Sequence, residues 1–166
     1  MLIVLAGLPG SGKTTVAREV VVRLAAVYLR IDVIEQALVS AKVLAGEVGP
    51  AGYDVAYELA RSNLALGATV VADCVNPLPV TREAWRAVAA STASRLLEVE
   101  IVCSDAVEHR RRVEHRTADI QGHVLPDWAS VSRHDYEPWT TDRLVIDTAI
   151  VSAGDAAQQI VAAARA

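Results

Sequence analysis

A glycine-rich segment near the N-terminus constrains the fold more than any other part of the sequence. Gly7 is followed, after four residues, by Gly12, Lys13 and Thr14. Glycines permit backbone angles that a side chain would forbid, so successive N–H groups can point at one anion. The apolar run at residues 2–6 precedes the segment, and helical periodicity begins at Lys13. Strand, glycine turn and helix in this order predict a phosphate-binding loop at a helix N-terminus.

The side chains of this loop indicate which ligand it would hold. In such a loop, Lys13 would reach the β- and γ-phosphates of a nucleotide, and the Thr14 hydroxyl would be a ligand of Mg²⁺. Of the 16 basic residues only Lys13 and Lys42 are lysines, so lysine stands where the loop requires it in a chain that otherwise uses arginine. We therefore predict ATP and Mg²⁺ as cofactors, with the loop residues Gly7, Pro9, Gly10, Ser11, Gly12, Lys13, Thr14 and Thr15 binding ATP.

Short apolar runs alternate with segments of helical periodicity along the whole chain. The runs that predict strands are residues 2–6, 27–31, 68–72, 96–103 and 144–146. The helices are expected over residues 13–26, 33–44, 53–66, 81–90, 104–116 (with Ser104 as N-cap) and 155–164. Residues 122–127 are expected to be irregular. The alternation, without long linkers or repeats, predicts a single three-layer α/β domain over residues 1–166, built around a mainly parallel sheet.

Composition excludes several classes of protein. A net charge of -4 argues against a protein whose main role is to coat nucleic acid, although a local basic pocket remains compatible with it. Cys74 and Cys103 are too few for a disulfide framework and lack metal-ligand spacing. The apolar start has no basic leader, and no apolar run approaches the ~20 residues that span a bilayer. We expect a cytoplasmic protein without a membrane partner.

Two carboxylates follow predicted strands. Asp32 comes after the second strand and Asp73 after the third, at the sheet edge where ligands of α/β proteins bind. Asp32 could accept the proton of a substrate hydroxyl, or it could cap the helix that follows. Asp73 could hold Mg²⁺ through a water, or it could begin the turn before Asn76 and Pro77.

An arginine-rich stretch spans residues 109–116, with Arg112 and Arg116 one helical turn apart. Arginines on one helix face can converge on a transferring phosphoryl group. Alternatively, the stretch is a solvated basic face that Glu108 and Glu114 partly neutralise. Three aromatic residues that follow it would line a mobile cover over the site or pack in the core: Trp128, Tyr136 and Trp139.

The class of nucleotide-binding protein follows from what accompanies the loop. The Asn-Lys-x-Asp motif of GTPases and the Leu-Ser-Gly-Gly signature of ABC-type ATPases do not occur in the sequence. The motifs GLPGSGKTT, RID, VVADCVNPLPVTREAW, HRRRVEHR and YEPW together resemble the predicted-kinase group of AAA-type P-loop ATPases. Relatives of that group are gluconate kinase, chloramphenicol phosphotransferase, zeta-type toxins and polynucleotide kinase. The resemblance runs from Leu2 to about Thr148.

The resemblance implies a P-loop NTPase fold with strand order 2-3-1-4-5 and a short lid at about residues 105–140. It also implies that Lys13, Asp32, Arg112 and Arg116 are catalytic, that Arg112 contacts ATP, and that Thr14 and Asp73 hold the metal. The residues expected to bind the substrate are Asp32, Glu35, Asp73 and Asn76. Polynucleotide kinases carry an arginine where this chain has Glu35, and a glutamate there would repel a phosphate.

The expected function is transfer of the γ-phosphate of ATP to a hydroxyl of a small molecule. One alternative keeps the chemistry but makes the acceptor a nucleotide or a polynucleotide 5′-hydroxyl, which the acidic net charge and Glu35 disfavour. The other alternative is an ATP-binding switch or weak ATPase that regulates a partner protein.

Overall fold

Five parallel strands form the sheet at the centre of the molecule. A computed structural model describes residues 1–42 and 48–166, and its sheet has the order β2-β3-β1-β4-β5. The strands are β1 (Leu2–Ala6), β2 (Val27–Arg30), β3 (Val70–Asp73), β4 (Leu96–Val102) and β5 (Leu144–Asp147). Parallel strands are buried on both faces, which explains why they appear as continuous apolar runs. The predicted fold class and strand order are confirmed.

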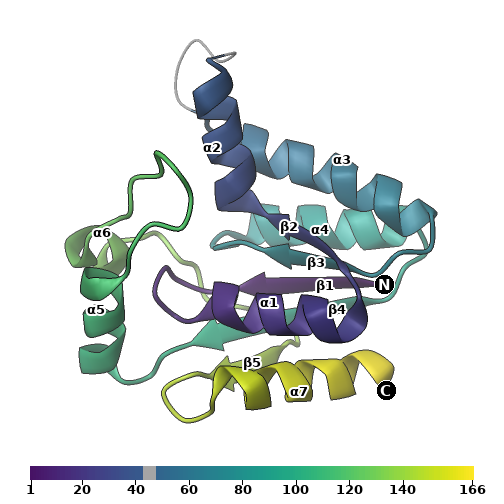
Figure 1. The fold of residues 1–166 in the computed structure, drawn as a ribbon. Helices are drawn as coiled ribbons and strands as arrows, with labels where there is room; N and C mark the ends of the chain where they lie inside the picture. The colour runs from purple at the N-terminus through teal and green to yellow at the C-terminus, as the bar shows by residue number, and fades with distance from the viewer. Residues whose placement is uncertain (43–47) are drawn as a thin grey trace.

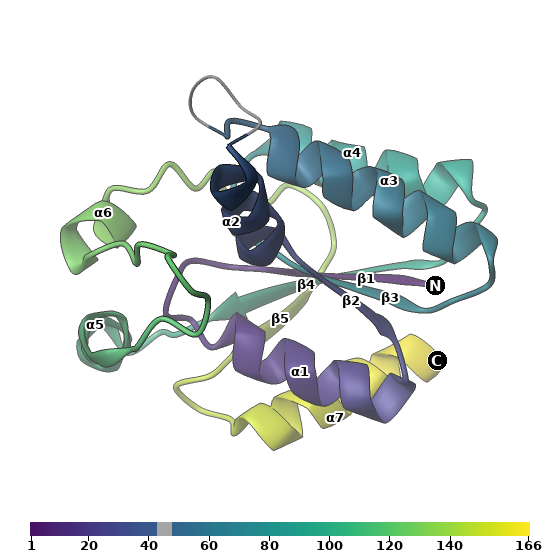
Figure 2. The same ribbon diagram turned by 45° about the horizontal axis from the view of Figure 1, so that its top comes forward.

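Helices cover both faces of this sheet. Figures 1 and 2 show α1 (Lys13–Leu24) and α7 (Ala153–Arg165) on one face, with α3 (Ala51–Ala65) and α4 (Pro79–Ser91) on the other. α2 (Ile31–Ala41) lies against α3. α5 (Ala106–His115) and α6 (Trp128–Ser132) stand beyond the carboxyl ends of the strands (Figure 1). The carboxyl edge of the sheet is therefore enclosed by elements that do not belong to either layer.

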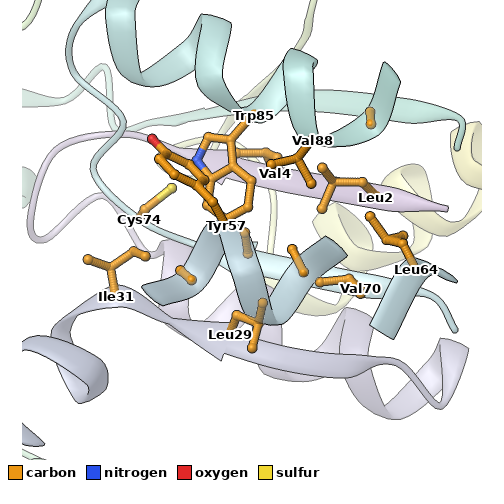
Figure 3. Packing of buried hydrophobic residues seen from close by; sticks show 14 residues of the cluster. Leu2, Val4, Leu29, Ile31, Tyr57, Leu64, Val70, Cys74, Trp85 and Val88 are labelled. Atoms are coloured by element: carbon orange, nitrogen blue, oxygen red, sulfur yellow. The ribbon is translucent and has the colours of Figure 1, made fainter. Parts of the chain in front are cut away.

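Alternating side chains of β1 supply the two halves of the core. Leu2 and Val4 face α3 and α4, where Tyr57 and Trp85 meet edge to face with ring centroids 4.6 Å apart (Figure 3). Ile3 and the other odd-numbered residues of the strand face α1 and α7. A register slip of one residue would exchange the two faces, so this packing fixes where β1 ends and the glycine loop begins.

Several boundaries differ from the sequence prediction. Asp105, not Ser104, caps α5, because its carboxylate accepts from the N–H groups of Val107 and Glu108. The Ser104 N–H instead donates to the Asp147 carboxylate at the end of β5, 3.0 Å away. The short helix α6 was not expected, and α2 begins at Ile31, two residues early. Residues 43 and 44 of the predicted second helix lie outside the described residues. No helix in the described ranges is long and apolar enough to cross a membrane.

Candidate active site

The glycine loop between β1 and α1 is pressed between β4 and α5. A Cβ atom at Gly7, whose φ is 141°, would lie 2.1 Å from the carbonyl oxygen of Ile101. A Cβ at Gly10, whose φ is 83°, would lie 2.5 Å from a methyl group of Val113. Backbone φ angles in this range are strained for any side chain. Both positions therefore require glycine, and they hold the loop in the shape of an anion cradle.

Lys13, the first residue of α1, follows the glycine loop directly. Its side chain is 8% exposed, and its ammonium donates to the Leu8 carbonyl at 3.2 Å. Burial lowers the pKa of Lys13, while the nearby carboxylates of Asp73 and Asp32 oppose that shift. The Thr148 hydroxyl donates to the Ser11 carbonyl at 2.7 Å and ties the loop to the end of β5. The ammonium thus lies in a low-dielectric position where an anion would bind strongly.

Asp73 at the end of β3 is the acceptor of two hydroxyl groups. The Thr14 hydroxyl donates to its Oδ2 at 2.8 Å, and the Tyr28 hydroxyl donates to the same oxygen at 2.7 Å. Burial and the Asp73 charge raise the pKa of Tyr28, so the phenol remains a donor. A hydroxyl beside a carboxylate is the hard oxygen pair that Mg²⁺ prefers. The described residues contain no cluster of three or more acidic, histidine or cysteine side chains that could hold a metal ion.

Arg30, the last residue of β2, connects the carboxylates at this edge. Its guanidinium lies 3.4 Å from Asp32, 2.7 Å from Asp119 and 4.0 Å from Asp73. Asp32 stands in the first turn of α2, where no side chain accepts a capping hydrogen bond. The alternative that Asp32 serves as a helix cap is therefore wrong. Its side chain is 39% exposed and faces the cavity.

A cavity of about 670 Å³ opens at this edge, large enough for a small ligand. It is lined by most of the residues that the sequence assigned to the site, namely Pro9, Gly10, Gly12, Lys13, Thr14, Thr15, Asp32, Asp73, Arg112 and Arg116. Gly7 and Ser11 line a smaller cavity of about 220 Å³ on the other side of the loop. The structure thus places the residues predicted to bind the nucleotide and the two predicted carboxylates, Asp32 and Asp73, around one cavity.

Glu35 and Asn76 do not line the large cavity. The Glu35 side chain packs against Gly52 of α3, where an added Cβ would lie 2.3 Å from its Cγ. Burial, with a smaller contribution from Asp32, raises the pKa of Glu35 to about 7. Asn76 is fully buried with φ at 50°, and its amide atoms find no hydrogen-bond partner among the described residues. Neither side chain reaches the space beside Lys13 in this structure.

The two predicted lid arginines differ in their surroundings. Arg112 donates to Glu108 at 2.7 Å, and to the hydroxyl and carbonyl oxygens of Thr148 at 2.8 and 3.1 Å. Arg116 follows the end of α5 in extended conformation; burial lowers its pKa, and its Nε lacks a partner in the described part of the chain. Glu108 also pairs with Arg111, as the alternative of a neutralised basic face predicted. The hydrogen bonds therefore hold the Arg112 side chain in place, while the Nε of Arg116 can still donate a hydrogen bond.

The three aromatic residues after α5 pack against protein groups. Trp128 meets the ring of His109 edge to face at 5.3 Å. Trp139 lies under the guanidinium of Arg82, 4.1 Å from the ring centroid, and Tyr136 lies at 5.3 Å from it. None of the three lines the large cavity, so packing rather than a cover describes them in this structure.

Sequence reasoning missed several residues at the site. They are Arg18, Tyr28, Arg30, His109 and Asp119. His109 is a support of the loop, because its Nε2 lies 2.8 Å from the Pro9 carbonyl. Arg30 carried a usable signal, since it precedes Asp32 by two residues at the end of a predicted strand. Asp119 carried none, because its partners are distant in sequence.

A family model described as an AAA domain matches residues 2–131, most of the chain. The chain belongs to the AAA_33 family. No curated protein matches this AAA_33 chain. Among solved structures, it resembles a candidate kinase from Chloroflexus aurantiacus (19% identity, TM-score 0.78, covering 99% of this chain and 95% of the other). It also resembles the APS kinase of Mycobacterium tuberculosis in complex with AMPPNP and APS (20%, 0.69, 99% and 97%).

A third similar structure is a gluconokinase from Sinorhizobium meliloti (22% identity, TM-score 0.68, covering 98% of the AAA_33 chain and 91% of the other). At these identities, the likeness shows a shared fold. The AAA_33 chain therefore has the fold of small P-loop kinases over nearly its whole length.

Proposed function

We propose that the protein is a Mg²⁺- and ATP-dependent phosphotransferase that acts on a hydroxyl of a small molecule. The observation that carries the proposal is one cavity in which a buried lysine, a hydroxyl–carboxylate pair and a second carboxylate meet. Loop N–H groups and Lys13 would hold the β- and γ-phosphates. Thr14 and Asp73 would hold Mg²⁺, which when bound neutralises charge on the phosphates.

Asp32 is the proposed general base. The acceptor hydroxyl oxygen forms a bond to the γ-phosphorus while the bond from that phosphorus to the β,γ-bridging oxygen breaks. The hydroxyl proton passes to the Asp32 carboxylate, and ADP leaves with the electron pair of the broken bond. Arg116, half-buried at the cavity with an Nε that lacks a partner among the described residues, would stabilise the charge on the moving group, and Arg112 would contact the nucleotide.

An assay of ADP release over a panel of hydroxyl acceptors tests this proposal. The Asp32→Asn variant should bind ATP as well as the parent protein but lose transfer by about 10²- to 10⁴-fold, the usual contribution of a general base. Asp142→Asn, a similar change at an exposed residue outside the cavity, should have parental activity. Full activity of Asp32→Asn would refute the role of Asp32.

The same assay separates the two alternative functions. Transfer to a short oligonucleotide or a nucleoside 5′-hydroxyl, but to no smaller alcohol, would favour a nucleotide or polynucleotide kinase. ADP release that is indifferent to every acceptor would favour an ATPase switch.

A further inference from the structure

Asp119 reaches into the cavity from the segment between α5 and α6. Its carboxylate pairs with Arg30 at 2.7 Å and with Arg18 of α1. These partners lie 89 and 101 residues away in sequence. The two arginines keep the pKa of Asp119 at about 2, so the side chain is an anion at neutral pH. An anion from a chain segment without regular structure thus occupies a position between two cations of the cavity.

The cation pair is built into the fold independently of Asp119. The Arg30 side chain is 10% exposed, and its buried Nε finds no hydrogen-bond partner within the described residues. Arg18 projects from the helix that follows the glycine loop, and both arginines line the cavity. Guanidinium groups are strong partners of oxyanions, and among the described residues Asp119 is the anion that joins these two arginines.

Two of the three carboxylates near Arg30 have a role in the proposed phosphoryl transfer. Asp32 would take the proton of the acceptor, and Asp73 would hold Mg²⁺. Asp119 has no part in that chemistry, and it lies in a segment outside the strands and helices. Its departure would leave Arg18 and Arg30 facing the space next to Asp32 with too little negative charge. A ligand that brings an anionic group would restore the balance.

We propose that the acceptor carries an oxyanion, a carboxylate or a phosphate, which replaces Asp119 between Arg18 and Arg30. This proposal rests on the proposed phosphotransferase function and names the class of its acceptor. The guanidinium of Arg30 touches both Asp32 and Asp119, so the reacting hydroxyl and the oxyanion are separated by only a few bonds. The acceptor is thus a compact hydroxy acid or a small phosphorylated alcohol.

The repulsion of phosphate that the sequence predicted for Glu35 does not apply at this position. Glu35 packs against Gly52 and lies outside the residues that line the cavity. The acidic groups that do face the proposed oxyanion are Asp32 and Asp73, and each of them is within 4.0 Å of the Arg30 guanidinium. The local balance of charge, rather than the net charge of the chain, therefore decides which acceptor enters.

The first test measures oxyanion binding without any turnover. The protein is saturated with Mg²⁺ and AMP-PNP, so that the glycine loop is filled, and is titrated with sodium phosphate and with sodium acetate in a calorimeter. Asp119→Asn removes the internal competitor and should tighten binding about tenfold, since a blocked site lowers the apparent affinity by its blocked fraction. Arg30→Gln should abolish binding. Whichever anion binds more tightly identifies the chemistry of the acceptor group.

A second variant guards against loss of folding. Arg18 has a side chain that is 57% exposed, so Arg18→Gln should fold even if Arg30→Gln does not, and it should weaken binding of the same anion. Asp142→Asn is the matched control for Asp119→Asn and should bind like the parent. Equal affinities of the parent, Asp119→Asn and Arg18→Gln proteins would overturn the proposal.

The second test compares acceptors that differ in the oxyanion alone. The ADP-release assay compares D-glycerate and glycerol 3-phosphate with glycerol. At least one of the two charged acceptors should be phosphorylated, and the activity with glycerol should be at least tenfold lower. Equal activity with glycerol would refute the oxyanion site but leave phosphoryl transfer intact. If no acceptor in a broad panel is phosphorylated, the proposed function fails, and the calorimetric titration still decides whether the oxyanion site exists.

Discussion

Loss of the Arg82 side chain should strongly destabilise this protein. It is 3% exposed at the start of α4. Its guanidinium donates to the carbonyl oxygens of Asn76 and Pro77 after β3, and to those of Glu137 and Pro138, at 2.7 to 3.1 Å. One side chain thereby joins the loop after β3 to a segment about 60 residues later. We call residues 136–139 the strap.

The magnitude follows from what Arg82→Met leaves behind. Met fills much of the volume but donates nothing, so the carbonyl oxygens of Asn76, Glu137 and Pro138 lose the guanidinium donor. The Pro77 carbonyl keeps the Glu137 N–H, and the ring of Trp139 loses the nearer of its two cations. Each unsatisfied buried carbonyl costs about 1–3 kcal/mol. Removal of the guanidinium also relieves its own desolvation penalty, and water reaches the strap once it loosens. We therefore expect a net loss of about 3–5 kcal/mol in the free energy of unfolding, in the range known for broken buried polar networks.

Urea unfolding followed by circular dichroism measures this loss. Arg82→Lys keeps the charge but not the planar fork, so it should lie between Met and the parent. Arg61→Gln removes an arginine that pairs with an exposed glutamate on one helix, and it should change stability by less than about 0.5 kcal/mol. A loss below about 1 kcal/mol for Arg82→Met would show that the four hydrogen bonds do not hold the strap.

Three further predictions concern the glycine loop and the half-buried carboxyl group of Glu35. Lys13→Met should abolish ATP binding in equilibrium titration while leaving the urea midpoint nearly unchanged or higher, since Lys13 is a desolvated cation. Gly7→Ala should lower the thermal midpoint by about 4–16 °C, because its Cβ would overlap the Ile101 carbonyl at 2.1 Å; about 2–4 kcal/mol of strain is implied. The pKa of Glu35 is raised to about 7, so unfolding free energy should fall as pH rises from about 4.5 to about 7, and Glu35→Gln should flatten that slope in urea titrations across this range. A slope that persists in Glu35→Gln would assign it to another group.

The elements that the sequence predicted well are those determined locally. The glycine loop, its preceding strand and the start of α1 follow from consecutive residues, and the strand order followed from the family resemblance. The cap of α5 was misplaced by one residue because Ser104 and Asp105 are both good caps. The choice between them depends on Asp147, which occupies the Ser104 N–H from 43 residues away.

The parts of the site that escaped prediction depend on contacts between distant segments. Nothing near Asp119 in the sequence indicates that it meets Arg18 and Arg30, and nothing near Arg82 indicates that it receives the strap. Glu35 illustrates the opposite error, since the resemblance to polynucleotide kinases suggested a substrate contact. Its side chain packs against Gly52 of α3 instead, a contact that the sequence around Glu35 does not indicate.

The central position of β1 has a consequence for how the protein is made. All five of its residues are fully buried, yet Leu2 pairs with Val70 and Leu96, which leave the ribosome about 70 and 95 residues later. At about 5–20 residues per second, the strand waits roughly 3–14 s for β3 and somewhat longer for β4. An unpaired apolar strand is prone to aggregation during that interval. Because Gly7 packs against the carbonyl oxygen of Ile101, the glycine loop cannot reach its final shape before β4 has been made.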